Sequence, residues 1–322
     1  MKALVTGASG FIGSRLVENL VDKGCDVRVL IHNRDFPGTV KVESMTGDIR
    51  DPATLKAAFR DRDILFHLAA ALGGSLLDKK EFEDINRIGT ENVLKEAMSS
   101  GIKKVIHFSS AGVLGAVKKN VITKENYQVN PINIYDQTKL QGETIALKFA
   151  AKGMNIMVVR PGWVYGPGDR RTFKLIKAIA KKHFILVTKG DIWQTPIFID
   201  DLIQGTILCA EKGRSGEIYH LAGKEVLTVK QIVDHIADTA GVKIPSFTLP
   251  LMSVRAAAFL LEKVFYIFKK EAPLTRGKLA FFIHPKPLSI DKSRCELGFD
   301  PKTDFATGIT KTFRWYREQG WI

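Results

Sequence analysis

A tyrosine and a lysine stand four residues apart in the stretch IYDQTK, as Tyr135 and Lys139. On a helix this spacing places both side chains on one face. A free phenol has a pKa of about 10, and a neighbouring ammonium lowers that pKa by stabilising the phenolate. Ser110, at the end of the apolar run HFSS, could hydrogen-bond a substrate oxygen. Together the three residues predict proton transfer at a hydroxyl or carbonyl group, although such a pair taken alone is more often a surface contact.

Glycines recur at three-residue intervals in GASGFIG, as Gly7, Gly10 and Gly13. The turn follows an apolar run and opens a stretch with helical spacing. Glycine allows the tight bend and lets a pyrophosphate approach bare amides at the positive end of a helix. Gly13 would let that helix pack closely on a sheet. The pattern predicts a dinucleotide-binding turn rather than a chance glycine-rich turn, and Lys139 could then hold the nicotinamide ribose.

The stretch LIHNRD, at the end of the second predicted strand, bears on the choice of nucleotide. NAD-binding proteins usually place an acid there for the ribose 2′-hydroxyl, and this chain has Ile31. The following His32 and Arg34 could hold a 2′-phosphate through charge-assisted hydrogen bonds. NADP is therefore favoured over NAD. The neighbouring Asp35 keeps NAD open, as does a purely solvated Arg34.

Short apolar runs alternate with helical stretches through most of the chain. Strands are predicted at residues 3–7, 26–32, 63–69, 104–110, 155–161 and 216–223, and helices at 14–23, 55–59, 85–99, 135–151 and 198–211. Apolar strands separated by helices indicate a parallel sheet covered on both faces. We therefore expect an α/β fold, a doubly wound parallel (Rossmann) sheet with a smaller, mixed C-terminal substrate domain. The dinucleotide-binding domain is assigned to residues 1–166 plus 196–223, and the substrate domain to 167–195 plus 224–322.

Composition narrows the class of protein. The 322 residues are 45% hydrophobic and 25% charged, which is ordinary for a globular protein with a core. The net charge of +14 comes without zinc-finger spacing, a basic tail or an aromatic RNA-binding motif, so nucleic-acid binding is not expected. Three separated cysteines favour a reducing compartment, and no metal site is expected.

The longest apolar stretch, residues 251–268, is interrupted by Arg255, Glu262 and Lys263. A spanning helix would need about twenty mostly apolar residues, and the chain starts directly with a strand, so a cytoplasmic address is expected. With Phe281 and Phe282 the stretch could line an apolar pocket or rest on a membrane. The alternative is that these residues form the core of the smaller domain.

As a set, these motifs resemble the extended short-chain dehydrogenase/reductase superfamily, also called the NAD-dependent epimerase/dehydratase group. TGASGFIG resembles its cofactor turn, GDIRD its adenine-side motif, FHLAA the strand and loop beneath the cofactor, and NRIGTENVL the helix with a structural Asn. YDQTK resembles its catalytic helix, and RPGWVYGPGD the loop near the nicotinamide. The resemblance implies Ser110, Tyr135 and Lys139 as catalytic residues. It implies NAD(P) contacts from Gly7, Ser9, Gly10, Phe11, Ile12, Gly13, His32, Arg34, Asp48, Ile49, Leu68, Ala69, Ala70, Lys139, Pro161 and Val164.

Two positions and the C-terminal segment bear on the substrate. Nucleotide-sugar enzymes of the group usually have an Asn near Trp163 and an Arg at Thr195, and both polar contacts are lost here. Residues 272–322 resemble 3β-hydroxysteroid dehydrogenase-like and dihydroflavonol-reductase-like members. The resemblance implies hydride transfer between NAD(P) and a hydroxyl or keto group of a steroid- or lipid-like molecule, and a homodimer. A nucleotide-sugar epimerase or dehydratase with tightly bound NAD stays open, as does a non-catalytic NADP-sensing protein.

Overall fold

The computed structural model describes residues 1–72, 77–245, 247–268, 272 and 274–322. Within them, seven strands form one sheet in the order β10-β6-β5-β4-β1-β2-β3, and each paired neighbour is parallel. The strands are β1 (Lys2–Thr6), β2 (Asp26–Ile31), β3 (Glu43–Thr46), β4 (Ile64–His67), β5 (Lys104–Phe108), β6 (Ile156–Pro161) and β10 (Ile218–Leu221). The predicted doubly wound parallel sheet is confirmed.

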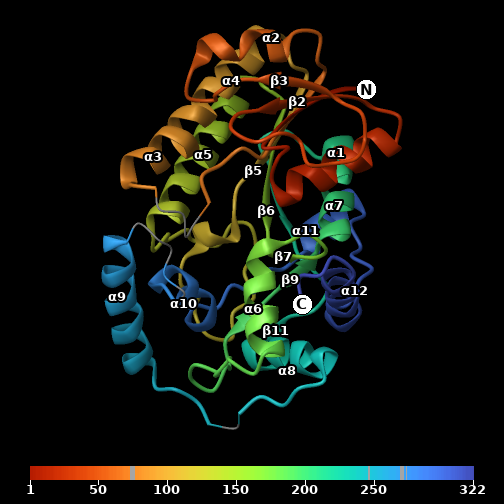
Figure 1. Cartoon of the computed structure of the whole chain (residues 1–322). Coiled ribbons are helices and arrows are strands. Elements are labelled where there is room, and N and C mark those ends of the chain that lie inside the picture. Colours follow the sequence, from red (N-terminus) through yellow and green to blue (C-terminus); the bar gives the residue numbers. More distant parts are fainter. Residues whose placement is uncertain (73–76, 246, 269–271, 273) are drawn as a thin grey trace.

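Helices cover both faces of this sheet (Figure 1). One face carries α1 (Phe11–Asp22) and α7 (Ile199–Lys212), which contact each other. The other carries α2 (Lys56–Phe59), α4 (Thr90–Ser99) and α5 (Ile134–Ala151). The strands are apolar throughout because each helical layer buries one of their faces: Val5 lies in the core on the α1 side and Leu4 in the core on the α5 side.

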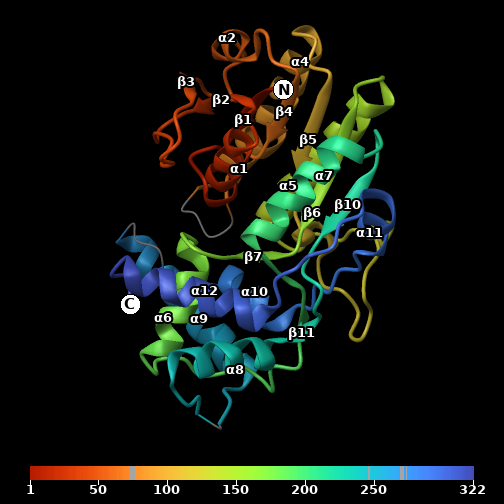
Figure 2. The ribbon, with the colours of Figure 1, turned by 90° about the vertical axis from the view of Figure 1, so that its right-hand side faces the viewer.

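Most of the remaining elements lie beyond the carboxyl end of the sheet (Figure 2). Short strand pairs join β7 (Trp163–Tyr165) to β9 (Pro196–Phe198) and β8 (Trp193–Gln194) to β11 (Leu227–Thr228). The helices there are α6 (Arg170–Ala180), α8 (Val229–Ala240), α9 (Leu251–Ile267), α10 (Arg276–Ile283) and α12 (Phe305–Glu318), of which α12 packs on α8. Helix α11 (Asp291–Leu297) instead packs on α7 and β10. The division into two domains stays a prediction.

Several element boundaries differ from those predicted. The helix expected at residues 85–99 begins earlier, with α3 (Lys79–Glu83), and passes through a π-helical turn (Asp84–Gly89) into α4. An aspartate capping box starts α3, with Asp78 and Glu81 exchanging hydrogen bonds. Strand β3 was not predicted, because its sequence ESMT is polar and mostly exposed at the sheet edge.

Candidate cofactor and catalytic site

The glycine turn lies where β1, α1 and the loop after β4 cross. Gly7 has a φ of +75°, and a Cβ on it would lie 2.6 Å from the amide nitrogen of Ala69. A Cβ on Gly13 would lie 2.2 Å from the carbonyl oxygen of Gly7. The amide of Gly10 donates to the same oxygen at 3.0 Å. Only glycine allows the backbone segments to approach this closely, as the sequence predicted.

The start of α1 fits a pyrophosphate. Its N-cap residue, Gly10, is exposed, and no side chain caps the helix, so its first amides have no side-chain acceptor. Phe11 and Ile12 are partly buried against the core beneath. The Ser9 hydroxyl donates to the carbonyl oxygen of Arg34 at 2.7 Å and ties the turn to the loop after β2.

Opposite charges gather at the predicted adenine side. The carboxylate of Asp48 accepts hydrogen bonds from Arg50 at 2.6 to 3.0 Å and lies 3.4 Å from the imidazole of His32. Burial raises the pKa of Asp48, but the hydrogen bonds from Arg50 outweigh it and leave the pKa below its usual value. Arg34 is exposed nearby in sequence, and Ile49 is buried against Gly89. The sequence analysis missed Arg50, although it lies two residues after Asp48 in GDIRD.

The loop after β4 is fixed at the end of β1. The amide of Leu68 donates to the carbonyl oxygen of Thr6 at 3.1 Å, and the amide of Ala69 to the Thr6 hydroxyl at 3.3 Å. Leu68, Ala69 and Ala70 are partly exposed along this crossing. The structure thus brings them next to Gly7, where a nucleotide on the turn would pass.

The structural asparagine expected from the resemblance holds this loop to the catalytic helix. Asn86, buried in the π-helical turn, accepts from the amide of Ala71 at 2.7 Å and donates to its carbonyl oxygen at 3.3 Å. Its amide also donates to the hydroxyl of Thr138 on α5 at 3.0 Å. One side chain therefore sets the distance between the loop and the helix of Tyr135.

Ser110 and Tyr135 come together at the carboxyl end of β5. The Ser110 hydroxyl accepts from the amide of Gly112 at 3.0 Å, and its interaction with the phenol of Tyr135 lowers the pKa of that phenol. Tyr135 stands in the first turn of α5, which is capped by Asn133. Since β1 and β5 run parallel in one sheet, this pair and the glycine turn share the carboxyl edge.

The expected lowering of the phenol pKa by Lys139 is wrong for this structure. Burial raises the pKa of Tyr135, and the groups that oppose the rise are Arg171 and Ser110. Lys139 is buried and donates to the carbonyl oxygen of Phe108 at 2.5 Å. A buried ammonium directed to a backbone carbonyl gives the phenolate little support. Burial lowers the pKa of Lys139 itself to about 8.

A buried ion pair lies one turn beyond Lys139. Glu143 accepts from Arg160 at 2.5 and 2.9 Å, and both side chains are 3% exposed. The Ser109 hydroxyl donates to the same carboxylate at 2.6 Å. The negative charge of Glu143 partly offsets the lowering of the Lys139 pKa. Sequence analysis missed this network, because nothing in the spacing of residues 109, 143 and 160 joins them.

A second helix, α6, brings the charge of Arg171 near the phenol of Tyr135. Arg171 is the second residue of α6, whose N-cap residue Asp169 accepts from the amides of Arg171 and Thr172. Its charge lowers the pKa of Tyr135. This residue was also missed, although it directly follows the GPGDR stretch.

The loop after β6 supplies the apolar side. Pro161 ends β6, and Val164 pairs with Ile197 between β7 and β9. The ring of Trp163 lies 4.7 Å from the ring of Phe281, between centroids. Trp163 is therefore part of an aromatic cluster.

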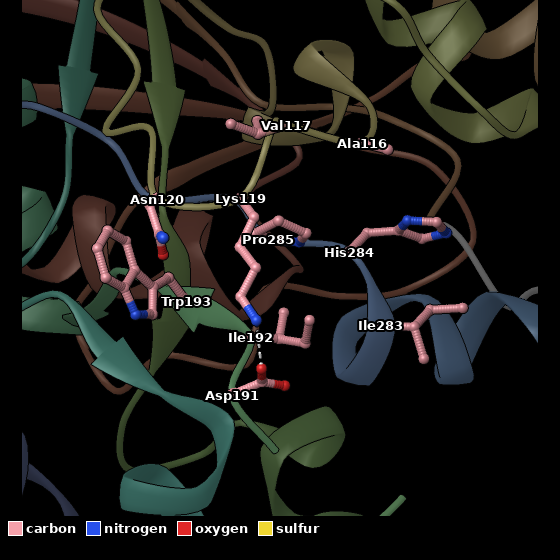
Figure 3. Close-up of a pocket in the computed structure, with 10 residues that line it drawn as sticks. All are labelled: Ala116, Val117, Lys119, Asn120, Asp191, Ile192, Trp193, Ile283, His284 and Pro285. Carbon is pink, nitrogen blue, oxygen red and sulfur yellow. Dashed lines mark hydrogen bonds and ion pairs between the residues drawn. The ribbon is translucent and has the colours of Figure 1, made fainter. Parts of the chain in front are cut away.

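A cavity of about 280 Å³ lies apart from these groups (Figure 3). The ion pair of Lys119 and Asp191 crosses it at 2.5 Å, with Trp193 to one side. The imidazole of His284 points away from the other side chains drawn. None of the predicted site residues lines this cavity. It is therefore separate from the glycine turn and from the catalytic residues.

The family model described as "NAD dependent epimerase/dehydratase family" matches residues 3–222, which include the sheet, the glycine turn and the catalytic group. The chain belongs to this family. A cofactor-dependent enzyme is supported, because the family is defined by NAD-dependent reactions and the glycine turn fits the nucleotide.

Relatives of this family member have different substrates. The chain is 29% identical over 317 residues to 4-hydroxy-2-methyl-3-oxo-4-farnesyl-3,4-dihydroquinoline-1-oxide ketoreductase of Stigmatella aurantiaca, covering 96% of this chain and 95% of that protein. It is 28% identical over 335 residues to sterol demethylase protein B of Methylococcus capsulatus, with 100% of each covered. Among solved structures, a double mutant of DesIV, the dTDP-glucose 4,6-dehydratase of Streptomyces venezuelae, has NAD and DAU bound. It is 26% identical with a TM-score of 0.80, covering 100% of this chain and 98% of that one.

Proposed function

We propose that the protein is an NAD(P)-dependent dehydrogenase or reductase of the Ser-Tyr-Lys type. The observation that carries the proposal is the position of Ser110, at the carboxyl end of β5, close enough to the phenol of Tyr135 to lower its pKa, at the same sheet edge as the glycine turn. Lys139 follows one turn later on α5. Bound at the turn, the nicotinamide nucleotide would supply the hydride acceptor or donor.

Each catalytic residue has a separate task in this proposal. The phenol oxygen of Tyr135 gives a proton to a carbonyl oxygen during reduction and takes it from a hydroxyl during oxidation. Ser110 orients that substrate oxygen. Because burial keeps the phenol protonated at neutral pH, the group is ready as a proton donor. Lys139 would hold the nicotinamide ribose.

We infer an apolar substrate with a ring ketone or hydroxyl. Trp163 and Phe281 offer an aromatic surface close to the catalytic edge. The Thr195 hydroxyl lies between the carbonyl of Lys286 and the amide of Leu288, so it is used within the fold. A diphosphate would need convergent donors at these positions. The names of the ketoreductase and the sterol demethylase protein B support the same substrate class.

We also propose that NADP is preferred over NAD. His32 and Arg50 flank the carboxylate of Asp48, and Arg34 is exposed on the adjacent loop. Asp48 is already paired with Arg50, which leaves the guanidinium of Arg34 for a 2′-phosphate. Ligand-linked shifts of the melting temperature with NADP and with NAD, at equal concentration, measure the preference directly.

Replacement of Tyr135 by Phe tests the catalytic assignment. Turnover should fall by roughly 10²- to 10⁴-fold, the usual contribution of a positioned acid or base, while the Kd for NADP stays within about twofold. Tyr127→Phe is the matched control, since it removes a phenol whose oxygen only accepts from the amide of Lys118.

The assay combines NADPH oxidation with steroid and polycyclic ketones and parallel reactions with UDP-glucose and dTDP-glucose. Turnover of the sugar nucleotides with retained NAD would replace the apolar-substrate proposal by epimerase or dehydratase chemistry. Binding of NADPH without hydride transfer to any substrate would indicate a sensor. Unchanged turnover in Tyr135→Phe would remove Tyr135 from the mechanism.

A further inference from the structure

Large apolar side chains are exposed on α9 and on the segment that leads into it. Of fourteen large hydrophobic residues exposed among the described residues, eight fall within positions 247–268. They are Phe247, Leu249, Met252, Phe259, Leu260, Val264, Ile267 and Phe268. Met252, Leu260 and Ile267 are 74%, 62% and 76% exposed. Figure 1 shows α9 at the outer edge of the molecule, with α10 beside it. Apolar exposure of this extent in one segment indicates an interaction surface.

The opposite side of α9 is also apolar. Val254 and Ala258 are 5% and 0% exposed, and Val254 packs with Val187 and Leu279 in a small separate core. Surface helices normally turn a polar face to water. A helix that is apolar on both sides needs a second apolar contact besides its own protein.

That second contact does not make α9 a membrane span. Within the described part of the chain, no helix has both the length and the apolar character needed to cross a bilayer. Helix α9 has 17 residues and carries Arg255 and Lys263 on its exposed side. A helix of this kind binds in the plane of an interface, with its long cationic side chains directed back to the surface.

The positive charge of α9 and its flanking residues indicates which kind of surface it binds. Residues 241–270 contain five Lys or Arg and one Glu, a net charge of +4. Of the charged side chains on α9, Arg255 and Lys263 are exposed, and Glu262 is half-buried. The Lys263 ammonium lies 5.8 Å from the ring centre of Phe259, so cation and apolar surface lie side by side. Two copies of the protein meeting through this face would bring like charges together, whereas an anionic lipid surface complements them.

We propose that α9 and residues 247–250 dock flat on a bilayer containing anionic phospholipids. The apolar side chains enter the acyl boundary, and Arg255 and Lys263 pair with lipid phosphates. Helix α10 packs on α9, and Lys286, just beyond α10, lies 3.7 Å from Asp136 beside Tyr135. The docked face is therefore joined to the catalytic side through α10. The proposal does not rest on the proposed function, because docking is measured without substrate or cofactor.

Vesicle flotation of the whole protein tests the proposal. The wild-type protein should float with vesicles of phosphatidylcholine and phosphatidylglycerol (7:3) and at least tenfold less with phosphatidylcholine alone. Flotation should fall as sodium chloride is raised to 0.5 M. Arg255→Glu with Lys263→Glu should weaken partition by roughly thirtyfold or more, the loss of two cations near an anionic surface.

Acidic substitutions on the apolar face provide the second arm. Leu260→Glu with Ile267→Glu should abolish flotation, whereas Met98→Glu, at a 44% exposed apolar residue on α4, should leave it unchanged. Circular dichroism shows whether the variants are folded. The salt series uses the wild-type protein alone, so its result does not depend on the folding of any variant. Absent flotation of the wild type, or equal flotation of wild type and variants, would overturn the proposal. A dimer contact would replace the proposal if the wild type did not bind vesicles and light scattering showed that it is a dimer, while the acidic variants are monomers.

Discussion

Replacement of Lys139 by Met should separate stability from function at the catalytic site. The side chain is 4% exposed and its ammonium donates to the carbonyl oxygen of Phe108. Met fills a similar volume without a charge to bury. The variant is expected to lose turnover, while its folded state is as stable as that of the wild type or more stable at neutral pH, where the buried ammonium is charged.

The magnitude comes from the difference between two pKa values. Burial lowers the pKa of Lys139 from 10.5 to about 8, which corresponds to roughly 3 kcal/mol between folded and unfolded states. Below pH 8 this penalty is present in full. Loss of the hydrogen bond to Phe108 costs about 1–3 kcal/mol in the variant. The net change at pH 7 should therefore lie between about zero and 2 kcal/mol of stabilisation.

The pH dependence of the free energy of unfolding tests the lysine pKa more sharply than the value at pH 7 alone. Between pH 8 and 10.5 the unfolded chain holds a proton at Lys139 that the folded protein has released. Wild-type stability therefore rises with pH across this window. The Lys139→Met variant lacks that contribution, so the free energy of unfolding of the wild type, minus that of the variant, should rise by up to roughly 3 kcal/mol between pH 8 and 10.5.

Urea unfolding of the cofactor-free protein at pH 7, 8, 9 and 10 measures both quantities. Lys148→Met, at an exposed lysine on the same helix, is the control for loss of a surface charge. A wild-type-minus-variant difference that stays constant across these pH values would refute a buried, weakly basic Lys139. Destabilisation of Lys139→Met by more than about 3 kcal/mol at pH 7 would do the same, because it exceeds the cost of the lost hydrogen bond alone.

Two further outcomes follow from the charges around the site. Glu143→Gln should destabilise the fold by about 3–5 kcal/mol in urea unfolding, because it leaves Arg160 charged, buried and poorly paired. Asp234→Asn, which breaks the exposed pair with Lys230, should cost less than about 1 kcal/mol, and similar losses in both would contradict the reasoning. Arg171→Gln should raise the pKa of Tyr135 further, since it removes a cation that stabilises the phenolate. Alcohol oxidation by this variant should be roughly twofold to fivefold slower below pH 9, the effect of one exposed charge, and an unshifted pH–rate profile would exclude Arg171 from this role.

Local sequence patterns were enough to predict the parallel sheet and the glycine turn. The apolar runs of β1, β4, β5 and β6 are continuous because both faces of each strand are buried. Such continuous runs can be recognised in the sequence. Gly7 and Gly13 could be assigned because close backbone approach excludes every other residue type. The edge strand β3 lacks that burial and gave no comparable signal.

The chemistry of the site was decided by tertiary structure. Sequence spacing placed Tyr135 and Lys139 on one helical face, but the direction of the Lys139 ammonium depends on the carbonyl of Phe108, 31 positions earlier in the chain. Two charges act on the phenol: Asp136, the next residue in the sequence, raises its pKa, and Arg171, on a different helix, lowers it. A pKa is set by every charge and by the burial around the group, and these become defined only when distant segments pack. The sequence determined which residues could react, and the packed structure determined the environment in which they do so.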